Sequence, residues 1–150
     1  MGNCVSGNKL GKKSEAKELL TVPFSTINIK NTKHLICDDA FTNRLVLKKY
    51  LILFGCDVDE AENGEDALNK VKQNGEYVTI WMDIKMPKMD GLDCTKYLRD
   101  IMEYKGLIIG LTGYVDDVTI NKCLTVGMNR VIAKPFDKKI IEFHIEDLKN

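Results

Sequence analysis

The sequence lacks several features that would assign it at once to a broad class of protein. None of its apolar runs approaches the ~20 residues that a membrane-spanning helix needs. Its 22 basic and 22 acidic residues give a formal net charge of zero. No overall field therefore recruits nucleic acid or acidic substrates. The two histidines, His34 and His144, stand far apart, without the spacing of paired metal ligands.

Cysteine is present, but not in a pattern that indicates disulfides or a metal site. The five cysteines are odd in number and scattered, and none forms a CxxC pair: they are Cys4, Cys37, Cys56, Cys94 and Cys123. This arrangement is more typical of reduced thiols in a cytosolic protein than of a disulfide framework.

The amino-terminal segment differs from the rest of the chain. Residues 1–33 contain six lysines against two glutamates, which is a charge of +4, so the remainder carries −4. Several glycines and polar residues accompany the lysines. We expect residues 1–32 to form a flexible basic arm and residues 33–150 to form one globular domain, a length sufficient for a core of its own.

From residue 33 onward, short strand-like runs alternate with stretches of helical spacing. The expected strands are 34–37, 57–61, 77–82, 107–111 and 130–133. Leu47, Leu51 and Phe54 illustrate the helical spacing between them. Asp90, Asp116 or Asp117, and Asp137 are suited to begin helices. Five strands alternating with five helices predict an α/β fold with a doubly wound parallel sheet covered on both faces.

Polar side chains follow the expected strands at the edge where such sheets bind ligands. Asp38 and Asp39 come after the first strand, Asp83 after the third, Thr112 after the fourth and Lys134 after the fifth. Because the carboxyl ends of parallel strands share one edge, these side chains should converge. Taken singly, each is more often a turn, a cap or a loop residue, but five together in this order make coincidence a poor explanation.

Three neighbouring carboxylates repel one another unless a cation joins them, and hard oxygen ligands suit Mg²⁺. An aspartate can also accept a phosphoryl group, a transfer that depends mainly on charge neutralisation and positioning. Lys134 supplies a second cation and Thr112 a hydroxyl donor. The pattern therefore indicates Mg²⁺-dependent phosphoryl transfer to a carboxylate.

From residue 33 to residue 148 the chain resembles the receiver domains of two-component response regulators, most closely those of hybrid histidine kinases. The segments that carry the resemblance are Asp38-Asp39, Asn43-Arg44, Ala61–Leu68, Met82–Gly91, Leu111–Gly113, Gly127–Asn129 and Lys134–Phe136. Of these, Met82–Gly91 is the most specific. The resemblance implies a flavodoxin-like (βα)5 fold with strand order 2-1-3-4-5.

The resemblance also implies roles for individual residues. Asp83 would be the phosphoacceptor, Thr112 the switch hydroxyl and Lys134 the ammonium that pairs with the phosphoryl group. Asp38, Asp39, Asp83 and the backbone carbonyl of Lys85 would hold Mg²⁺. A cis peptide bond would precede Pro135. The partners would be a phospho-histidine donor, either a histidine kinase or a histidine phosphotransfer protein, and an unidentified downstream protein.

Two features depart from, or vary within, the family pattern. Val131 stands where many receivers have an aromatic residue that moves with the threonine, which puts an aromatic switch in doubt. Lys85 and Tyr114 occupy the positions that, in the family, flank the path of the hydrolytic water.

The first six residues match the myristoylation pattern M-G-x-x-x-[ST], with Gly2 as the acylated residue. Cys4 could carry a palmitoyl chain, and Lys9, Lys12 and Lys13 could add attraction to anionic lipid. We therefore expect a cytoplasmic protein tethered to the cytoplasmic face of a membrane in a eukaryotic cell. A chance match within a glycine-rich start is the alternative.

No output domain is expected, because only Lys149 and Asn150 follow the last predicted helix. Output would then be a protein–protein contact or the draining of phosphoryl groups from a relay, and the only reactions catalysed would be the chain's own phosphorylation and dephosphorylation. One alternative is a pseudo-receiver that binds partners without taking phosphate. Another is a phosphatase of the haloacid-dehalogenase class. That class carries a D-x-D motif after its strand, whereas the residue two positions after Asp83 here is Lys85.

Overall fold

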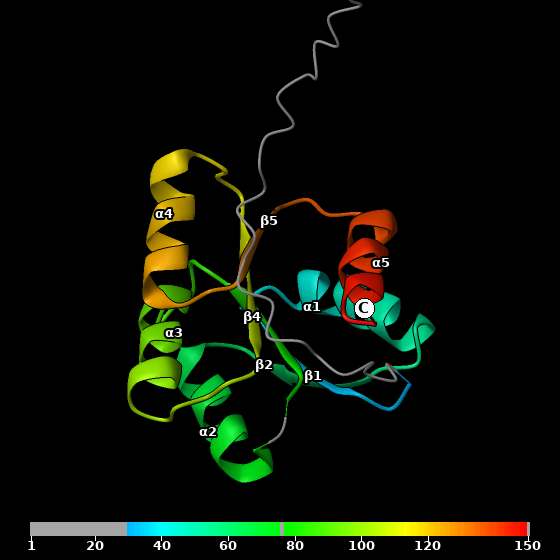
Figure 1. Cartoon of the computed structure of the whole chain (residues 1–150), viewed down its shortest axis with the longest axis horizontal. Coiled ribbons are helices and arrows are strands. Elements are labelled where there is room, and N and C mark those ends of the chain that lie inside the picture. Colours follow the sequence, from blue (N-terminus) through cyan, green and yellow to red (C-terminus); the bar gives the residue numbers. More distant parts are fainter. Residues whose placement is uncertain (1–29, 76, 150) are drawn as a thin grey trace, which may run out of the picture.

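A computed structural model of the chain describes residues 30–75 and 77–149, so most of the predicted arm lies outside the described residues. Strands and helices alternate along this part of the chain (Figure 1). They are β1 (Lys33–Cys37), α1 (Phe41–Leu53), β2 (Asp57–Ala61), α2 (Gly64–Asn74), β3 (Thr79–Asp83), α3 (Gly91–Asp100), β4 (Leu107–Thr112), α4 (Asp117–Val126), β5 (Arg130–Ala133) and α5 (Lys138–Asp147). None of the helices in these two ranges is both long and apolar enough to cross a membrane.

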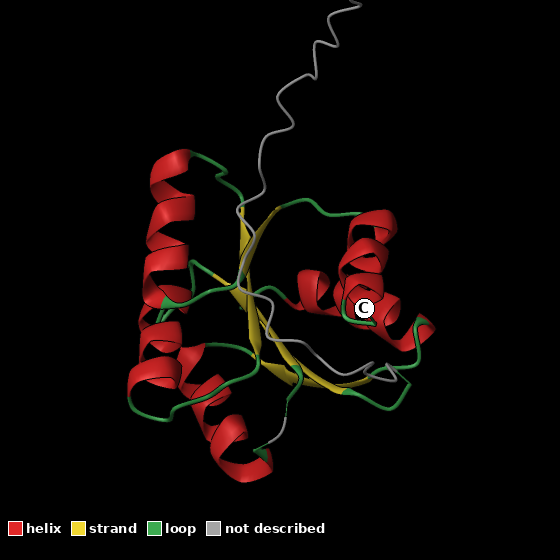
Figure 2. Ribbon diagram, in the orientation of Figure 1, coloured by secondary structure: helices red, strands yellow, loops and turns green. Residues whose placement is uncertain are grey.

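The strands form one parallel sheet in the order β2-β1-β3-β4-β5, which confirms the predicted topology. Helices α1 and α5 lie on one face, and α2, α3 and α4 lie on the other (Figure 2). Neighbouring residues of a strand serve opposite faces: Ile36 and Trp81 pack with α1 and α5, whereas Leu35 packs with α2 and α3. Both faces are therefore buried, as a sheet built from β-α-β crossovers requires.

The third strand begins two residues later than predicted and ends one residue later. The paired ladders begin at Thr79, opposite His34 and Leu107. Val78, just before the strand, already bonds to both neighbours: its amide donates to the Lys33 carbonyl at 2.8 Å, and its carbonyl accepts from the Leu107 amide at 3.0 Å. The Tyr77 hydroxyl donates to a carboxylate oxygen of Asp59 at 2.6 Å. At the other end the ladder continues to Asp83, so this carboxylate belongs to the rigid strand itself.

Four of the five helices begin with a side chain that accepts a hydrogen bond from the third residue of the helix. Asp90, Asp116 and Asp137 do so as predicted, and Asn63, which was not predicted, caps α2. Helix α1 begins at Phe41 without such a cap. The nearby Asp38 carboxylate accepts from the Ala40 amide at 2.8 Å and otherwise faces the sheet edge.

Arg99, near the end of α3, holds the opposite end of the sheet through contacts that the sequence does not announce. Its guanidinium donates to the carbonyl oxygens of Tyr104 at 2.6 Å, Gly106 at 2.8 Å and Gly127 at 3.0 Å. It also donates to the Asn129 amide oxygen at 2.8 Å. These bonds tie carbonyl groups at the end of α4 and in the loop before β4 to the end of α3.

His34 is a fully buried histidine in β1 with a partner on each ring nitrogen. Trp81 Nε1 donates to His34 Nδ1 at 3.3 Å, and the Thr32 hydroxyl lies 3.0 Å from Nε2. Because Nδ1 must accept, the ring is neutral. Burial lowers the pKa of His34 to about 4.

This pKa predicts a loss of stability in acid. The unfolded chain takes up a proton near pH 6.5 and the folded chain only near pH 4, so stability is lost as pH falls through this window. From pH 7 to pH 5 the His34 contribution should be about 2 kcal/mol of unfolding free energy. Urea unfolding followed by Trp81 fluorescence at both pH values measures it. His34→Asn keeps an acceptor for the indole but cannot be protonated, so it should lose about 2 kcal/mol less; equal losses in the two proteins would contradict the assignment.

Candidate functional site

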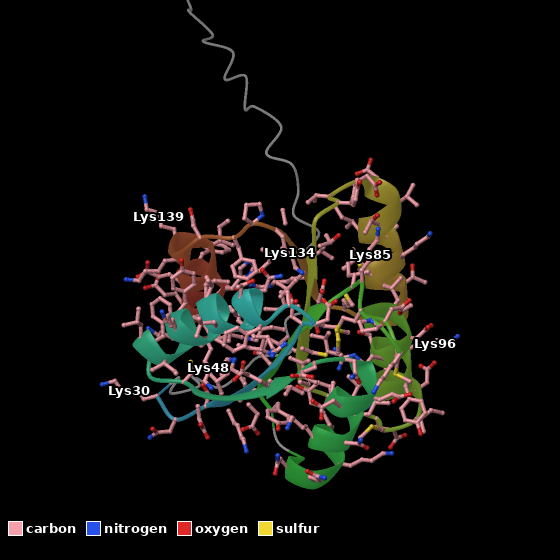
Figure 3. The ribbon with its side chains drawn as sticks, turned by 180° about the vertical axis from the view of Figure 1, so that it is seen from behind. Lys30, Lys48, Lys85, Lys96, Lys134 and Lys139 are labelled. Carbon is pink, nitrogen blue, oxygen red and sulfur yellow. The ribbon has the colours of Figure 1, made fainter. Side chains whose placement is uncertain are left out.

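The five predicted site residues meet at the carboxyl edge of the sheet. Asp83 and Thr112 are the last residues of β3 and β4, and Asp38 and Lys134 directly follow β1 and β5. Oxygen atoms of Asp38, Asp39 and Asp83 all lie within 4.8 Å of one another. Figure 3 shows Lys134 and Lys85 at this edge, whereas Lys30 and Lys96 lie away from it.

Lys134 bridges two of the three carboxylates. Its Nζ lies 2.9 Å from Asp38 Oδ2 and 2.9 Å from Asp83 Oδ1. Burial alone would lower the pKa of Lys134, but its hydrogen bonds to Asp83 and Asp38 raise it above the usual value. The ammonium is therefore charged at neutral pH. Together with the three carboxylates it leaves a net charge of −2 at the edge.

Asp83 is buried at the end of the central strand. Burial raises its pKa to about 6, and Asp38 and Asp39 push in the same direction while Lys134 opposes them. A carboxylate with this pKa is ionised at neutral pH but poorly solvated. Such a group gains strongly from an added cation, and a pKa perturbed in this way makes Asp83 a candidate for the reactive member of the cluster.

Asp38 is held by donors on α1 whose importance the sequence did not reveal. Asn43 Nδ2 lies 3.3 and 3.2 Å from the two Asp38 carboxylate oxygens, and Arg44 Nη1 donates to the Asp38 carbonyl at 2.8 Å. Arg44 is itself buried and pairs with Glu60 on β2 at 3.3 Å. Asp39 is exposed at the rim. The two adjacent aspartates therefore differ: Asp38 is fixed from several sides, and Asp39 is open to solvent.

Thr112 directs its hydroxyl to its own loop. The Thr112 Oγ1 atom donates to the Tyr114 carbonyl at 3.1 Å and accepts from the Tyr114 amide at 3.0 Å. The Tyr114 side chain is 67% exposed, and Lys85 Nζ lies 5.2 Å from the centre of its ring. A pocket opens here, lined by Asp83, Ile84, Lys85, Thr112, Gly113, Tyr114 and Lys134. Lys85 and Tyr114 thus both line the pocket and are both exposed.

The loop after Asp83 folds back against the strand, which explains Gly91 in the Met82–Gly91 segment. A Cβ atom on Gly91 would lie 2.1 Å from the Asp83 carbonyl oxygen, so only glycine fits this approach. The Gly91 amide donates to the Ile84 carbonyl at 2.8 Å. The loop is thus fixed relative to Asp83 by backbone contacts.

The remaining features of the resemblance are found at their expected places. The peptide bond between Lys134 and Pro135 is cis. Val131 is partly buried and packs against the core between the sheet and α2, α3 and α4. No aromatic ring therefore stands beside Thr112 on β5. Gly2 and Cys4, the predicted acylation residues, lie outside the described residues.

The donor set at this edge fits Mg²⁺. Three carboxylates lie close together, one of them open to solvent, and hard oxygen ligands with room for water are what this ion prefers. The expected contribution of the Lys85 carbonyl stays a prediction. With its net charge of −2, the cluster would be neutralised by one divalent cation.

Comparison with known proteins agrees with this geometry. The response regulator receiver domain family matches residues 35–146. The chain is 36% identical over 133 residues to the osmosensing histidine protein kinase SLN1 of Saccharomyces cerevisiae, covering 85% of this chain and 11% of that protein. It is 37% identical over 136 residues to the sensor protein EvgS of Escherichia coli K12, covering 90% of this chain and 11% of that protein. The chain thus corresponds to a small part of these relatives.

Solved structures give the same result. The CheX–CheY–BeF3–Mg²⁺ complex from Borrelia burgdorferi contains a chain that is 25% identical, with a TM-score of 0.74, covering 79% of this chain and 90% of that one. CheY4 of Vibrio cholerae is 27% identical with a TM-score of 0.73, covering 79% of this chain and 99% of that one.

Proposed function

The chain belongs to the response regulator receiver family, and we propose that it works as a phosphorylation switch in which Asp83 accepts the phosphoryl group. It is a signalling receiver domain rather than a conventional enzyme. The observation that carries the proposal is the position of Asp83, buried at the end of β3 with a pKa of about 6 and paired with Lys134. We propose that this domain comprises residues 33–150 and that residues 1–32 form a separate arm.

The donor would be a phospho-histidine on a histidine kinase or a phosphotransfer protein. An Asp83 oxygen attacks the phosphorus, the bond between phosphorus and the donor nitrogen breaks, and the imidazole keeps the electron pair. Lys134 then turns from the two carboxylates to the phosphoryl oxygens. Asp38, Asp39, Asp83 and the Lys85 carbonyl would hold Mg²⁺, which supplies positive charge to the phosphoryl oxygens.

Thr112 would convert phosphorylation into a change of the loop. Its hydroxyl has one hydrogen to donate, which now goes to the Tyr114 carbonyl. Donating to a phosphoryl oxygen instead would break that bond and loosen the segment before α4, which would then be held to Thr112 by the Tyr114 amide alone. This route needs no aromatic residue at position 131, so the departure at Val131 does not argue against a working switch.

The assignment of the acceptor predicts a mass change. With Mg²⁺ and acetyl phosphate, wild type should gain one phosphoryl group that is stable in acid and labile in base, measured as intact mass. Asp83→Asn should gain none. Asp39→Ala keeps the acceptor but loses a carboxylate of the metal site, so it should react much more slowly. Full labelling of Asp83→Asn would show that another residue is the acceptor. A wild type that takes no label would favour the pseudo-receiver alternative.

The Lys85–Tyr114 pair predicts a long-lived phosphoryl group. These side chains stand at the mouth of the pocket, where they hinder water from approaching the phosphorus in line. Replacing them with groups that can orient a water, as in a Lys85→Asn, Tyr114→Glu double variant, should shorten the lifetime about tenfold, equivalent to ~1.4 kcal/mol of barrier. Loss of the phosphorylated mass with time at fixed pH and Mg²⁺ measures this. Lys88→Asn, exposed in the same loop, is the matched control and should leave the lifetime unchanged. An unchanged lifetime in the double variant would show that Lys85 and Tyr114 do not control the attacking water.

We also propose that the arm is acylated at Gly2 and Cys4 and tethers the domain to the cytoplasmic face of a membrane. The support is the sequence pattern alone: a myristoylation match at Gly2, a cysteine two residues later and three nearby lysines. One myristoyl chain gives marginal binding, so the second signal matters.

Membrane fractionation of the protein made in eukaryotic cells tests the tether. Wild type should sediment with membranes, Gly2→Ala should remain in the supernatant, and Cys4→Ser should divide between the two. The same distribution for wild type and Gly2→Ala would rule out an anchor at this position.

A further inference from the structure

Arg44 on α1 is buried beside the acidic site, with only 7% of its surface exposed, which is rare for an arginine. Its Nη1 atom donates to the Asp38 carbonyl oxygen at 2.8 Å. Its Nε atom lies 3.3 Å from Glu60 Oε1 on β2, and its Nη2 atom lies 3.5 Å from Glu62 Oε1, one residue beyond β2. The guanidinium therefore joins α1, the end of β1 and the end of β2.

The carbonyl group that Arg44 holds belongs to the peptide unit between Asp38 and Asp39. The ladder between β1 and β2 ends one residue earlier, where Cys37 stands opposite Ala61. The Asp38 amide still donates to the Ala61 carbonyl at 3.1 Å, and Arg44 binds the carbonyl on the other side of the residue. Because a peptide unit is planar, fixing this carbonyl also fixes the direction in which the chain enters Asp39. This matters most for Asp39, because that carboxylate is exposed.

The ion-pair network around Arg44 carries no net charge. Lys48 Nζ lies 2.8 Å from Glu60 Oε2. The two cations of the network thus face two carboxylates, those of Glu60 and Glu62. An unbalanced cation at this place would repel a metal ion bound nearby, and a balanced one repels it far less. Arg44 can therefore hold the peptide unit by hydrogen bonding and leave the net charge of −2 at the sheet edge to attract a cation.

We propose that Arg44 is a positioning residue for the metal site: it fixes the peptide unit between Asp38 and Asp39 so that both carboxylates can bind one divalent cation. The inference rests on the proposed function, since it takes Mg²⁺ to bind at these carboxylates. Groups that hold a metal ligand from behind change the metal affinity about tenfold or more when they are removed. Lysine is a poor substitute here, because one ammonium group lacks the planar fork that reaches a carbonyl and two carboxylates at once.

Calorimetric titration of the full chain with Mg²⁺ tests this role, because it measures affinity without phosphorylation. Arg44→Lys keeps the positive charge, so electrostatics alone predicts an unchanged affinity, whereas we expect the dissociation constant to rise about tenfold. Arg44→Met removes the charge and leaves Glu60 and Glu62 incompletely balanced. Electrostatics alone then predicts tighter binding of Mg²⁺, whereas loss of the positioning bond predicts weaker binding. We expect weaker binding in both variants.

Arg99→Lys is the matched control, because Arg99 donates to four oxygen atoms at the opposite end of the sheet. It should lower the free energy of unfolding in urea and leave the dissociation constant for Mg²⁺ unchanged. Urea unfolding of every variant shows that the titrated protein is folded. Should Arg44→Met fail to fold, Arg44→Lys decides the question.

Two results would overturn the positioning role: a dissociation constant for Arg44→Lys equal to that of wild type, or tighter binding of Mg²⁺ by Arg44→Met. An equal loss of affinity in Arg99→Lys would also overturn it, since the effect would then follow from lower stability. A wild type that binds no Mg²⁺ would instead refute the proposed metal site itself, so failure of the inference and failure of the proposed function give different results.

Discussion

The fold places several carboxylates at one partly buried edge, and a single ammonium group makes that arrangement tolerable. Lys134 reaches from the end of β5 to Asp38 and Asp83, which belong to the ends of β1 and β3. Without this bridge, carboxylates withdrawn from water would repel one another. Much of the surrounding architecture serves the same arrangement. Asn43 and Arg44 fix Asp38 from α1, and the close approach of Gly91 fixes the loop beyond Asp83.

The rigid sheet divides the site into a fixed part and an adjustable part. Asp83 and Thr112 are ends of buried strands, and their backbones are held by ladder hydrogen bonds. Asp39, Lys85 and Tyr114 are exposed. In the proposed switch, the phosphoacceptor and the hydroxyl that follows it are therefore strand residues, whereas the site residues open to solvent belong to loops. This division follows from the parallel sheet, whose strands end at one edge while their connecting loops remain at the surface.

The sequence predicts the order of the elements, three helix caps and the convergence of the five site residues, because these follow from local periodicity and strand polarity. It places the start of β3 at Tyr77, whereas the paired ladders begin at Thr79, because strand limits depend on the register with neighbouring strands and not on local composition alone. It does not reveal the contacts of Arg99, or the way in which Asn43 and Arg44 hold Asp38. Those bonds join segments that are distant in the sequence. The sequence pattern of a helix does not distinguish a polar residue that faces solvent from one that bonds to a carbonyl oxygen.

In the proposed switch, the Thr112 hydroxyl would give up its bond to the Tyr114 carbonyl while still accepting the bond from the Tyr114 amide. The bond given up is a single neutral hydrogen bond, which contributes about 1 kcal/mol net, so it favours the resting arrangement of the loop only modestly. Some molecules should therefore break this bond without phosphorylation. A partner protein could distinguish the two states only if phosphorylation breaks the bond in a much larger share of the molecules. A hydroxyl that a ligand can redirect easily is, for the same reason, only weakly held when the ligand is absent.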